Sequence, residues 1–203
     1  MRKVPGRRPV PKKNSKFVTY LKTGPVPRII FIRYMKAGEH LMFRDMRRIN
    51  QLLSKEDTDA IMNRCTNGVL ACCGDDDYPY AVPVSFVCHS ENINFHLAKS
   101  GHKIDAIEKN PKVSFAVIDE DRIVSKEYTS YFRSVIAFGR ARMVEGEERL
   151  EAFRALVEKY SGDQPEEAKH KEITGCTNAC IVAIDVDHIT GKEAIEFVRA
   201  KNG

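Results

Sequence analysis

The stretch over residues 78–103 constrains the fold more than any other part of this chain. It reads Y-P-Y-A-V-P-V-S-F-V-C-H-S-E-N-I-N-F-H-L-A-K-S-G-H-K. We interpret it as an apolar strand over residues 80–88, a polar turn, a returning strand over residues 93–97, and a short basic loop with a glycine. Proline within the first strand favours a sheet edge or a bulge. Because the strands are so closely connected, we expect Ser85, His96 and the loop to lie within reach of one another.

The rest of the chain adds helices and strands without the regular alternation that a parallel sheet requires. Strand patterns recur at residues 69–73, 112–118, 128–144 and 179–186, which gives six predicted strands in all. Helical patterns begin at Ser54, which caps the first helix before Asn67-Gly68 ends it, and recur at residues 102–109, 147–160 and 192–200. We expect a charged loop at residues 119–127, a short charged helix that runs through Lys171, and a turn at residues 187–191.

Two features decide the fold class. Gly139 lies inside the longest strand pattern and predicts a bulge, which is how a long strand bends around a barrel. No G-x-G-x-x-G motif opens a helix, so a dinucleotide-binding fold of parallel strands is not expected. The predicted fold is therefore mainly β with flanking helices, in the form of a small antiparallel barrel.

Basic residues are distributed unevenly. Residues 1–40 carry eleven Lys and Arg and one acid, Glu39, whereas the remainder carries 22 Lys and Arg against 27 Asp and Glu. We therefore divide the chain into a basic extension, residues 1–41, and one folded domain, residues 42–203. Because the domain is mildly acidic, we expect it to bind no nucleic acid. No apolar run reaches the length that spans a membrane.

The basic extension is too rich in proline and charge to fold alone. It could be a tail for nucleic acid or membrane, a transit-like peptide, or a translated leader that precedes the native start. We favour the leader, because Met42 and Met46 directly precede the first well-formed element. A nucleic-acid role for the extension would predict salt-sensitive DNA retention that is lost when residues 1–41 are removed.

The six cysteines indicate no disulfide framework, because the chain is neither short nor led by a signal peptide. Most of them sit in apolar segments, where thiols are inert, and a reducing cytoplasm is the compartment we expect. Cys176 and Cys180 are spaced so that a redox role is conceivable, but no flanking motif tunes their reactivity. We expect no metal site, since no Cys or Glu stands at ligand spacing from the strand histidine, His96.

The basic loop, Ser100-Gly101-His102-Lys103, opens a predicted helix. Unpaired N–H groups at a helix start favour an anion, Lys103 adds a positive charge, and Ser100 and His102 can donate hydrogen bonds. A simpler interpretation is an N-capping serine followed by solvated basic residues. His96 has the same ambiguity: it is either a half-buried histidine bonded to a carbonyl, or a ring that contacts a ligand or donates a proton.

Four segments in this order resemble the pyridoxamine 5′-phosphate oxidase-like flavoproteins, and within them the nitroimidazole reductase branch. They are Y-P-Y-A-V-P-V-S-F, then N-F-H-L-A-K-S-G-H-K-I-D-A-I-E-K-N-P-K-V-S-F, then Y-F-R-S-V-I-A-F-G-R-A-R, and I-T-G-K-E-A. The resemblance runs from about Met42 to the C-terminus. It implies a six-stranded antiparallel split β-barrel that binds FMN at the interface of a homodimer.

The resemblance also assigns roles to individual residues. Four residues of the first strand would line the isoalloxazine: Val82, Pro83, Val84 and Ser85. Phe95 and His96 would sit at the flavin edge. The phosphate would be held by Ser100, His102 and Lys103. Tyr131, Arg133, Ser134 and Lys192 would approach the site, in one possible arrangement from the partner subunit. His96 would orient or protonate the substrate.

The function that this resemblance implies is FMN-dependent reduction of a small organic compound, with a nitroaromatic as one candidate and NAD(P)H or another donor to reload the flavin. Two alternatives stay open. Pyridoxamine 5′-phosphate oxidation shares the scaffold, but the C-terminal residues 193–203 lack the arginine- and histidine-bearing segment of those oxidases. A non-catalytic protein that binds flavin, haem or another flat ligand is the other.

Overall fold

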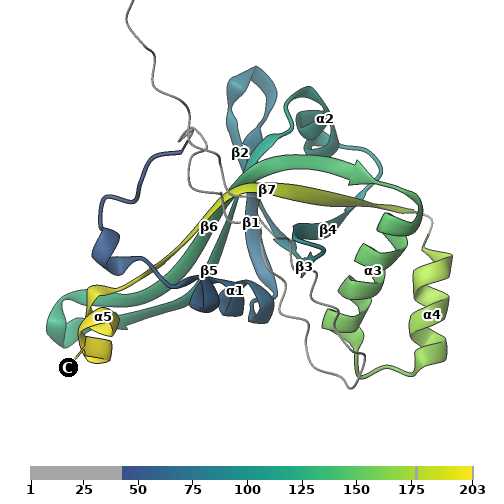
Figure 1. Ribbon diagram of the computed structural model, residues 1–203. Coiled ribbons are helices and arrows are strands. Elements are labelled where there is room, and N and C mark those ends of the chain that lie inside the picture. Colours follow the sequence, from purple (N-terminus) through teal and green to yellow (C-terminus); the bar gives the residue numbers. More distant parts are fainter. Residues whose placement is uncertain (1–42, 177, 203) are drawn as a thin grey trace, which may run out of the picture.

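The computed structural model describes residues 43–176 and 178–202 (Figure 1). The basic extension predicted for residues 1–41, with the leader hypothesis, therefore lies outside the described residues. The strands are β1 (Asn67–Cys73), β2 (Pro79–Ser85), β3 (Val87–His89), β4 (Asn92–Ala98), β5 (Lys112–Val124), β6 (Thr129–Val144) and β7 (Ala179–Glu193). The helices are α1 (Lys55–Arg64), α2 (His102–Lys109), α3 (Gly146–Ser161), α4 (Glu166–Gly175) and α5 (Ile195–Asn202).

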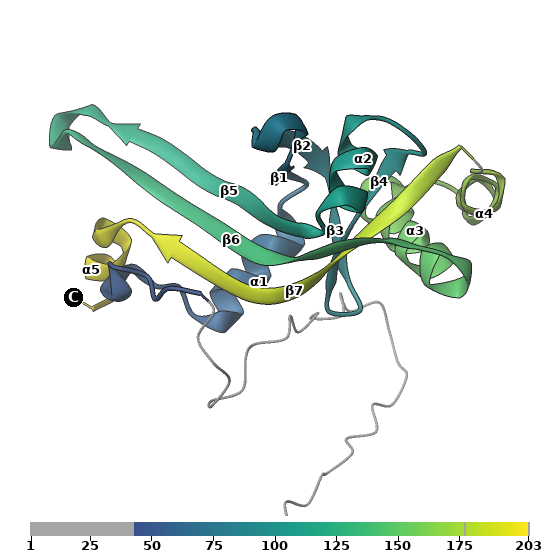
Figure 2. The ribbon, with the colours of Figure 1, turned by 90° about the horizontal axis from the view of Figure 1, so that it is seen from above.

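All seven strands form one antiparallel sheet in the order β2-β1-β5-β6-β7-β4-β3. The two edge strands, β2 and β3, are consecutive in sequence and are joined by Phe86 alone. A single residue can join opposite edges only if the sheet curls until those edges meet. The sheet is accordingly a split barrel, with α3 and α4 together on one side and α5 at the end farthest from them (Figures 1 and 2).

The break at Phe86 corrects the predicted strand count from six to seven. The phenol of Tyr160 lies against this residue: the Phe86 N–H donates to the Tyr160 hydroxyl at 2.8 Å, and the Phe86 carbonyl lies 2.9 Å from the same oxygen. A buried backbone must pair its polar groups, and here a side chain replaces a neighbouring strand. The continuous pattern over residues 80–88 therefore becomes two strands on opposite edges.

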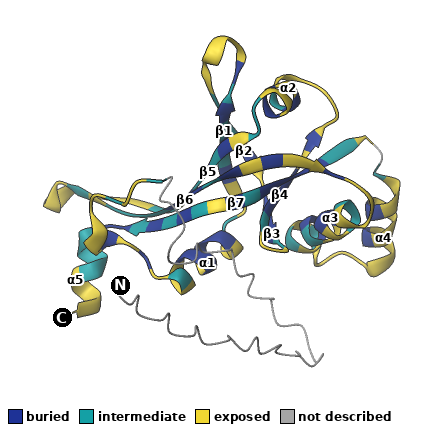
Figure 3. Cartoon of the chain, turned by 45° about the horizontal axis from the view of Figure 1, so that its top comes forward, coloured by how far each residue is buried: buried dark blue, intermediate teal, exposed yellow. Residues whose placement is uncertain are grey.

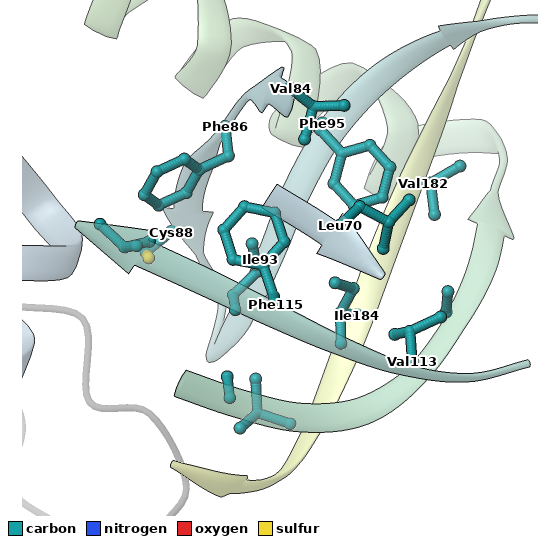
Figure 4. Close-up of a cluster of buried hydrophobic side chains, with 14 of the residues drawn as sticks. Leu70, Val84, Phe86, Cys88, Ile93, Phe95, Val113, Phe115, Val182 and Ile184 are labelled. Carbon is teal, nitrogen blue, oxygen red and sulfur yellow. The ribbon is translucent and has the colours of Figure 1, made fainter. Parts of the chain in front are cut away.

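Apolar side chains from almost every strand fill the barrel. Phe86, Phe95 and Phe115 are fully buried, and Phe115 packs against Phe86 edge-on with ring centroids 5.0 Å apart (Figure 4). A second apolar cluster lies outside the barrel, where α3 and α4 cover β3 and β7. It contains Phe153 and Leu156, so the helix predicted for residues 147–160 is present as α3 and packs by an apolar stripe on one face.

The predicted charged loop at residues 119–127 is wrong. β5 continues to Val124, and its charged end pairs with β6 in register, as in Asp121 opposite Phe132. Charged side chains are tolerated because this hairpin extends beyond the body and both of its faces are largely open to solvent (Figures 2 and 3). The turn shrinks to residues 125–128, and Tyr128 at its tip is 98% exposed.

The predicted turn at residues 187–191 is also wrong, and the predicted bulge at Gly139 explains why. The register of β6 against β7 shifts between Phe138 and Gly139, which leaves Asp187 as the extra residue on β7. A side chain at Gly139 would collide with the carbonyl of Asp185. The polar residues that resemble a turn therefore belong to one bent strand that reaches Glu193.

The first helix starts as predicted, with the Asp57 N–H donating to the Ser54 hydroxyl at 2.9 Å. It ends earlier than predicted, at Arg64, so that Asn67 and Gly68 begin β1 instead. A side chain at Gly68 would meet the ring of Phe115, so glycine here allows close packing of β1 on the core.

Candidate functional site

Ser85 and His96 line one cavity of about 600 Å³. It opens between the ends of β2 and β4 on one side and helices α3 and α4 on the other. Strand alternation puts both side chains on the exposed side of the sheet, since Ser85 follows buried Val84 and His96 lies between buried Phe95 and Leu97. The predicted juxtaposition of Ser85 and His96 is therefore present, whereas the basic loop expected beside them does not line this cavity.

Four predicted contact residues of β2 divide between the two faces of the strand. Val84 is buried and Val82 half-buried, whereas Pro83 and Ser85 are exposed. β2 is an edge strand, which is one of the two alternatives that its proline favours, and it pairs with β1 on one side. A ligand on the outer side can therefore meet exposed side chains and unpaired backbone groups, while the valines support the strand from the core.

The side chain of Phe95 does not lie where its predicted contact with the flavin edge would require. Its ring is fully buried and stacks on Phe115 with centroids 6.3 Å apart. The ring therefore belongs to the core, and only the backbone of this residue could face a ligand. Its neighbour His96 has no such restriction, because its side chain points away from the core.

The basic loop packs against the other end of β2. The His102 ring stacks on Tyr80 with centroids 4.2 Å apart, and its Nε2 lies 3.6 Å from Asp75 Oδ2. The residue that caps α2 is Gly101, at φ +119°, and no side chain caps the helix. The simpler interpretation of Ser100 as an N-capping serine is therefore wrong, and its exposed hydroxyl is not used to cap the helix.

The remaining predicted residues form a second group at a different end of the chain. Tyr131, Arg133 and Ser134 lie on β6 near its hairpin, and Ser134 pairs with Lys192 of β7. Arg133 is held by Glu120 at 2.8 Å and stacks over Phe197 of α5 at 3.8 Å. Figures 1 and 2 both show this end, marked by α5, well separated from α2 and β4. One chain thus does not bring its two groups of predicted residues together.

Tyr160 and Lys159 at the end of α3, which were not predicted from the sequence, contact the backbone of the sheet beside the cavity. Tyr160 lines the cavity, and its hydroxyl contacts the carbonyl of Thr66 as well as Phe86. The Lys159 ammonium donates to the Cys65 carbonyl at 2.6 Å and lies 4.3 Å from the Phe86 ring centroid. A signal for Tyr160 did exist, because it continues the apolar stripe of α3 one turn beyond Leu156.

Burial shapes the protonation of this region. Desolvation raises the pKa of the Tyr160 phenol and lowers the pKa of Lys159. Desolvation also raises the pKa of Cys65 to about 11 and that of Cys88 to about 12. These two thiols therefore stay protonated at neutral pH and are poor nucleophiles.

Two further features of the described residues concern metal ions and membranes. No group of three or more His, Cys, Asp and Glu side chains gathers there as the ligands of a metal ion would. Within the same ranges, the helices are all too short or too polar to cross a lipid bilayer.

Comparison with known proteins gives the following matches. A family model described as pyridoxamine 5′-phosphate oxidase matches residues 54–193. Uncharacterized protein RA0666 of Rhizobium meliloti (strain 1021) is 29% identical over 153 residues, which are 71% of this chain and 95% of that protein.

Two solved structures share the fold. One is a proposed 5-nitroimidazole antibiotic resistance protein from Bacteroides thetaiotaomicron VPI-5482, with a TM-score of 0.59 and 20% identity, over 70% of this chain and 86% of that chain. The other is the FAD and heme binding protein from Mycobacterium smegmatis, with a TM-score of 0.57 and 17% identity, over 74% of this chain and 78% of that chain. At these identities the likeness concerns the fold alone.

Proposed function

Because this chain belongs to the pyridoxamine 5′-phosphate oxidase family, we propose that it binds FMN and reduces a small organic acceptor, with a nitroaromatic as the first candidate. The family match covers the whole sheet, so the proposal concerns the barrel and not the basic extension. The likeness in fold to a proposed nitroimidazole resistance protein supports this choice of acceptor.

The layout of β2 is the observation that carries the proposal. Ser85 and His96 lie at one end of the strand, and His102 stacks on Tyr80 at the other. Tyr80 and Ser85 are five positions apart on the extended strand, a distance of about 17 Å, and their side chains lie on opposite faces of it. A flat ring system with an extended phosphorylated side chain can span this distance. The exposed edge of β2 would then support the molecule along its length.

The residues present fit each part of such a ligand. At the α2 end, the Ser100 hydroxyl is not spent on capping, and Lys103 has no carboxylate partner among the described residues. One hydroxyl, one ammonium and the free N–H groups of a helix start match one phosphate group. At the cavity end, exposed Pro83 and Ser85 offer a surface for the ring. We therefore favour FMN, which carries a single phosphate.

When bound, the flavin supplies the two-electron chemistry. The protein supplies binding, orientation and a proton donor. His96 is the titratable side chain that strand geometry exposes in the cavity beside Ser85, so we assign it the role of orienting or protonating the acceptor. Phe95, the neighbour of His96 on β4, packs in the apolar core behind it.

We further propose that the site is completed by a second copy of the chain. Tyr131, Arg133, Ser134 and Lys192 lie together at the end of β6 and β7 that faces away from the first group. In a two-fold dimer, any contact between a first patch of one subunit and a second patch of its partner occurs twice, related by the two-fold axis. Each flavin would then contact β2, β4 and α2 of one subunit and β6 and β7 of the other.

A comparison of two flavins tests the phosphate assignment. We expect Lys103→Gln to weaken FMN binding by about ten-fold, because a charge-assisted contact to phosphate is worth about 1.4 kcal/mol or more. Riboflavin, which lacks the phosphate, should bind the variant and the parent protein equally well. Titration followed by flavin fluorescence measures both affinities.

The matched control is Lys109→Gln, which removes the same charge from the last turn of the same helix. It should leave both affinities unchanged. Equal loss of FMN and riboflavin in Lys103→Gln, or loss of FMN in the control, would contradict a phosphate clamp at the start of α2.

One observation favours a second candidate function. An exposed histidine in a mainly apolar cavity of about 600 Å³ is also what a haem-binding protein requires for an axial ligand. The relative from Mycobacterium smegmatis with this fold is described as binding both FAD and heme. A non-catalytic carrier of this kind would show an intense haem absorbance band and no turnover with any reductant. Pyridoxamine 5′-phosphate oxidation would instead yield pyridoxal phosphate and peroxide.

A further inference from the structure

The cavity extends beyond Ser85 and His96 into a space between α3 and α4 that the proposed flavin contacts do not use. We propose that this part of the cavity binds the electron acceptor and selects uncharged, mainly apolar ring compounds over anionic ones. The inference rests on the proposed function, because it assigns the substrate class of the same site.

The α3 side of this space is apolar. Phe153, Leu156 and Val157 line it, and all three are at most 8% exposed because they also pack in the cluster outside the barrel. Ala168 of α4 faces them and leaves the space open, since its side chain is a single methyl group. Apolar surface of this kind stabilises a bound ring by excluding water, and the amount grows with the area covered.

The α4 side carries two charged residues that line the cavity, Lys169 and Glu172. Lys169 lines the cavity with its side chain only 8% exposed, and its ammonium donates to Glu166 at 2.6 Å and Glu158 at 2.9 Å. Glu172, one turn further along α4, lines the same wall. The lining therefore holds one carboxylate, Glu172, and one ammonium, Lys169, which is already paired with Glu158 of α3 and Glu166 of α4 outside the lining.

The other nearby cations are held by backbone carbonyls. Arg149 is not a lining residue, and its guanidinium donates to the carbonyls of Cys176 at 2.6 Å and Ala179 at 3.4 Å. The Lys159 ammonium donates to the Cys65 carbonyl and lies over the Phe86 ring. The basic residues that could hold a phosphate lie at the start of α2, near the opposite end of β2. An anionic acceptor in this cavity would thus meet the Glu172 carboxylate, while the lining cation Lys169 is already paired, and such an arrangement disfavours it.

His96 and Tyr160 are polar side chains of the cavity lining, as are Ser85, Ser161 and Gln164. The Tyr160 hydroxyl is held by the backbone of Phe86 and Thr66, whereas the exposed His96 ring can form a hydrogen bond with a ligand. A neutral ring with one polar substituent could therefore lie along the α3 face with that substituent at His96. A nitroaromatic without ionised groups has this shape, and a phosphorylated amine does not.

The test compares nitrobenzene with 4-nitrobenzoate, two probes that differ by one carboxylate. Isothermal titration calorimetry on the FMN-loaded protein should show nitrobenzene binding at least about ten-fold more tightly. Glu172→Lys, which places a cation on the exposed wall, should reduce this ratio to about three-fold or less. Equal affinities in the parent protein, or a ratio that Glu172→Lys does not change, would overturn the charge selection.

A second pair of variants tests the position. Ala168→Trp should fill the space and weaken both probes by about ten-fold, while FMN affinity stays unchanged. His170→Trp places the same ring on α4 outside the cavity lining and should change neither probe. Unaltered probe binding in Ala168→Trp, with circular dichroism matching the parent, would place the acceptor elsewhere and overturn the inference.

These outcomes separate the inference from the proposed function. If the protein takes up no FMN, the proposed function fails, and the same titrations on the flavin-free protein still decide the selectivity, because every lining residue used here belongs to this chain. If FMN binds and neither probe does, the inference fails and the flavin proposal stands.

Discussion

Single side chains decide where this sheet can do chemistry. Ser85 and His96 face the cavity because each follows a buried neighbour in an alternating strand. A one-residue shift in the register of β2 would turn Ser85 into the core, and the same shift in β4 would turn His96 into it. The same logic places Phe95 in the core and removes its ring from the site, although its position in the sequence is adjacent to His96.

At the same scale, one ion pair ties α1 to the sheet. Asp119 sits at the irregular point of β5, and both of its carboxylate oxygens accept hydrogen bonds from Arg64, at 2.7 Å in the case of Nε. The hydrogen bonds from Arg64 hold the pKa of Asp119 below its ordinary value of 3.8. This stabilisation is therefore present above about pH 4 and is lost as the pH falls through the lowered pKa.

We predict that Asp119→Asn lowers the free energy of unfolding at pH 7 by about 1 kcal/mol, as for a well-aligned pair near the surface. The difference from the parent protein should shrink as the pH falls below 4. Urea denaturation at a series of pH values measures it, with exposed Asp121→Asn as the control. A difference that is the same at pH 7 and at the lowest pH where both proteins fold would refute this account.

At the scale of elements, the end of α3 closes the barrel. Tyr160 pairs the backbone of Phe86, the one residue between the two sheet edges, and also contacts Thr66 in the link from α1 to β1. Helix α3 therefore acts on the junction that presents Ser85, although no part of the helix belongs to the sheet. The contact between Tyr160 and Phe86 thus connects the helix that lines the cavity, α3, to the sheet that carries Ser85.

We predict that Tyr160→Phe destabilises the protein by about 1–3 kcal/mol, because the ring is kept while buried groups of Phe86 lose their partner. It should also weaken flavin binding, since Ser85 adjoins the unpaired residue. The control is Tyr128→Phe, at the 98% exposed tip of the hairpin, which should change neither property. Equal stability of Tyr160→Phe and the control in urea would contradict the closing role.

Local patterns predict the elements well where local forces decide them. The Ser54 cap, the apolar face of α3, the edge position of β2 and the bulge at Gly139 all follow from side-chain chemistry within a few residues. The family resemblance also predicted the split barrel, and the family match confirms it. The strand break at Phe86 could not be predicted, because it depends on a phenol 74 residues away.

The incorrect predictions of a loop at residues 119–127 and a turn at residues 187–191 have a related cause. Charged and polar runs at residues 119–127 and 187–191 look like loops, but strand pairing across a solvent-exposed hairpin and a bulge overrides local preference. The cavity was half predicted: Ser85 and His96 come from local alternation, whereas Tyr160 and Lys169 reach it through helix packing that no local pattern specifies.

At the scale of the whole molecule, the site is divided between two ends of the chain. Ser85, His96 and the α2 loop lie at one end, and Tyr131 to Ser134 with Lys192 at the other (Figures 1 and 2). The proposed dimer explains this division, because each end would meet the opposite end of a partner. The two groups would then be complete only when they come from different subunits.

A mixing experiment tests that arrangement. We predict that His96→Asn and Lys192→Glu each abolish acceptor reduction alone, and that co-expression of the two restores about a quarter of the parent activity. Half of randomly formed dimers are mixed, and each mixed dimer holds one intact site of its two. The double variant with both changes in one chain, co-expressed with the parent, is the control for expression. No recovery from the two single variants would mean that one chain supplies the whole site.

The binding of FMN is the central claim, and an absorbance spectrum tests it most directly. Purified full-length protein, mixed with FMN and separated from free flavin by gel filtration, should carry the yellow flavin bands at close to one FMN per chain and should bleach on anaerobic reduction. A protein that emerges colourless, or that instead carries a haem band, would contradict the account.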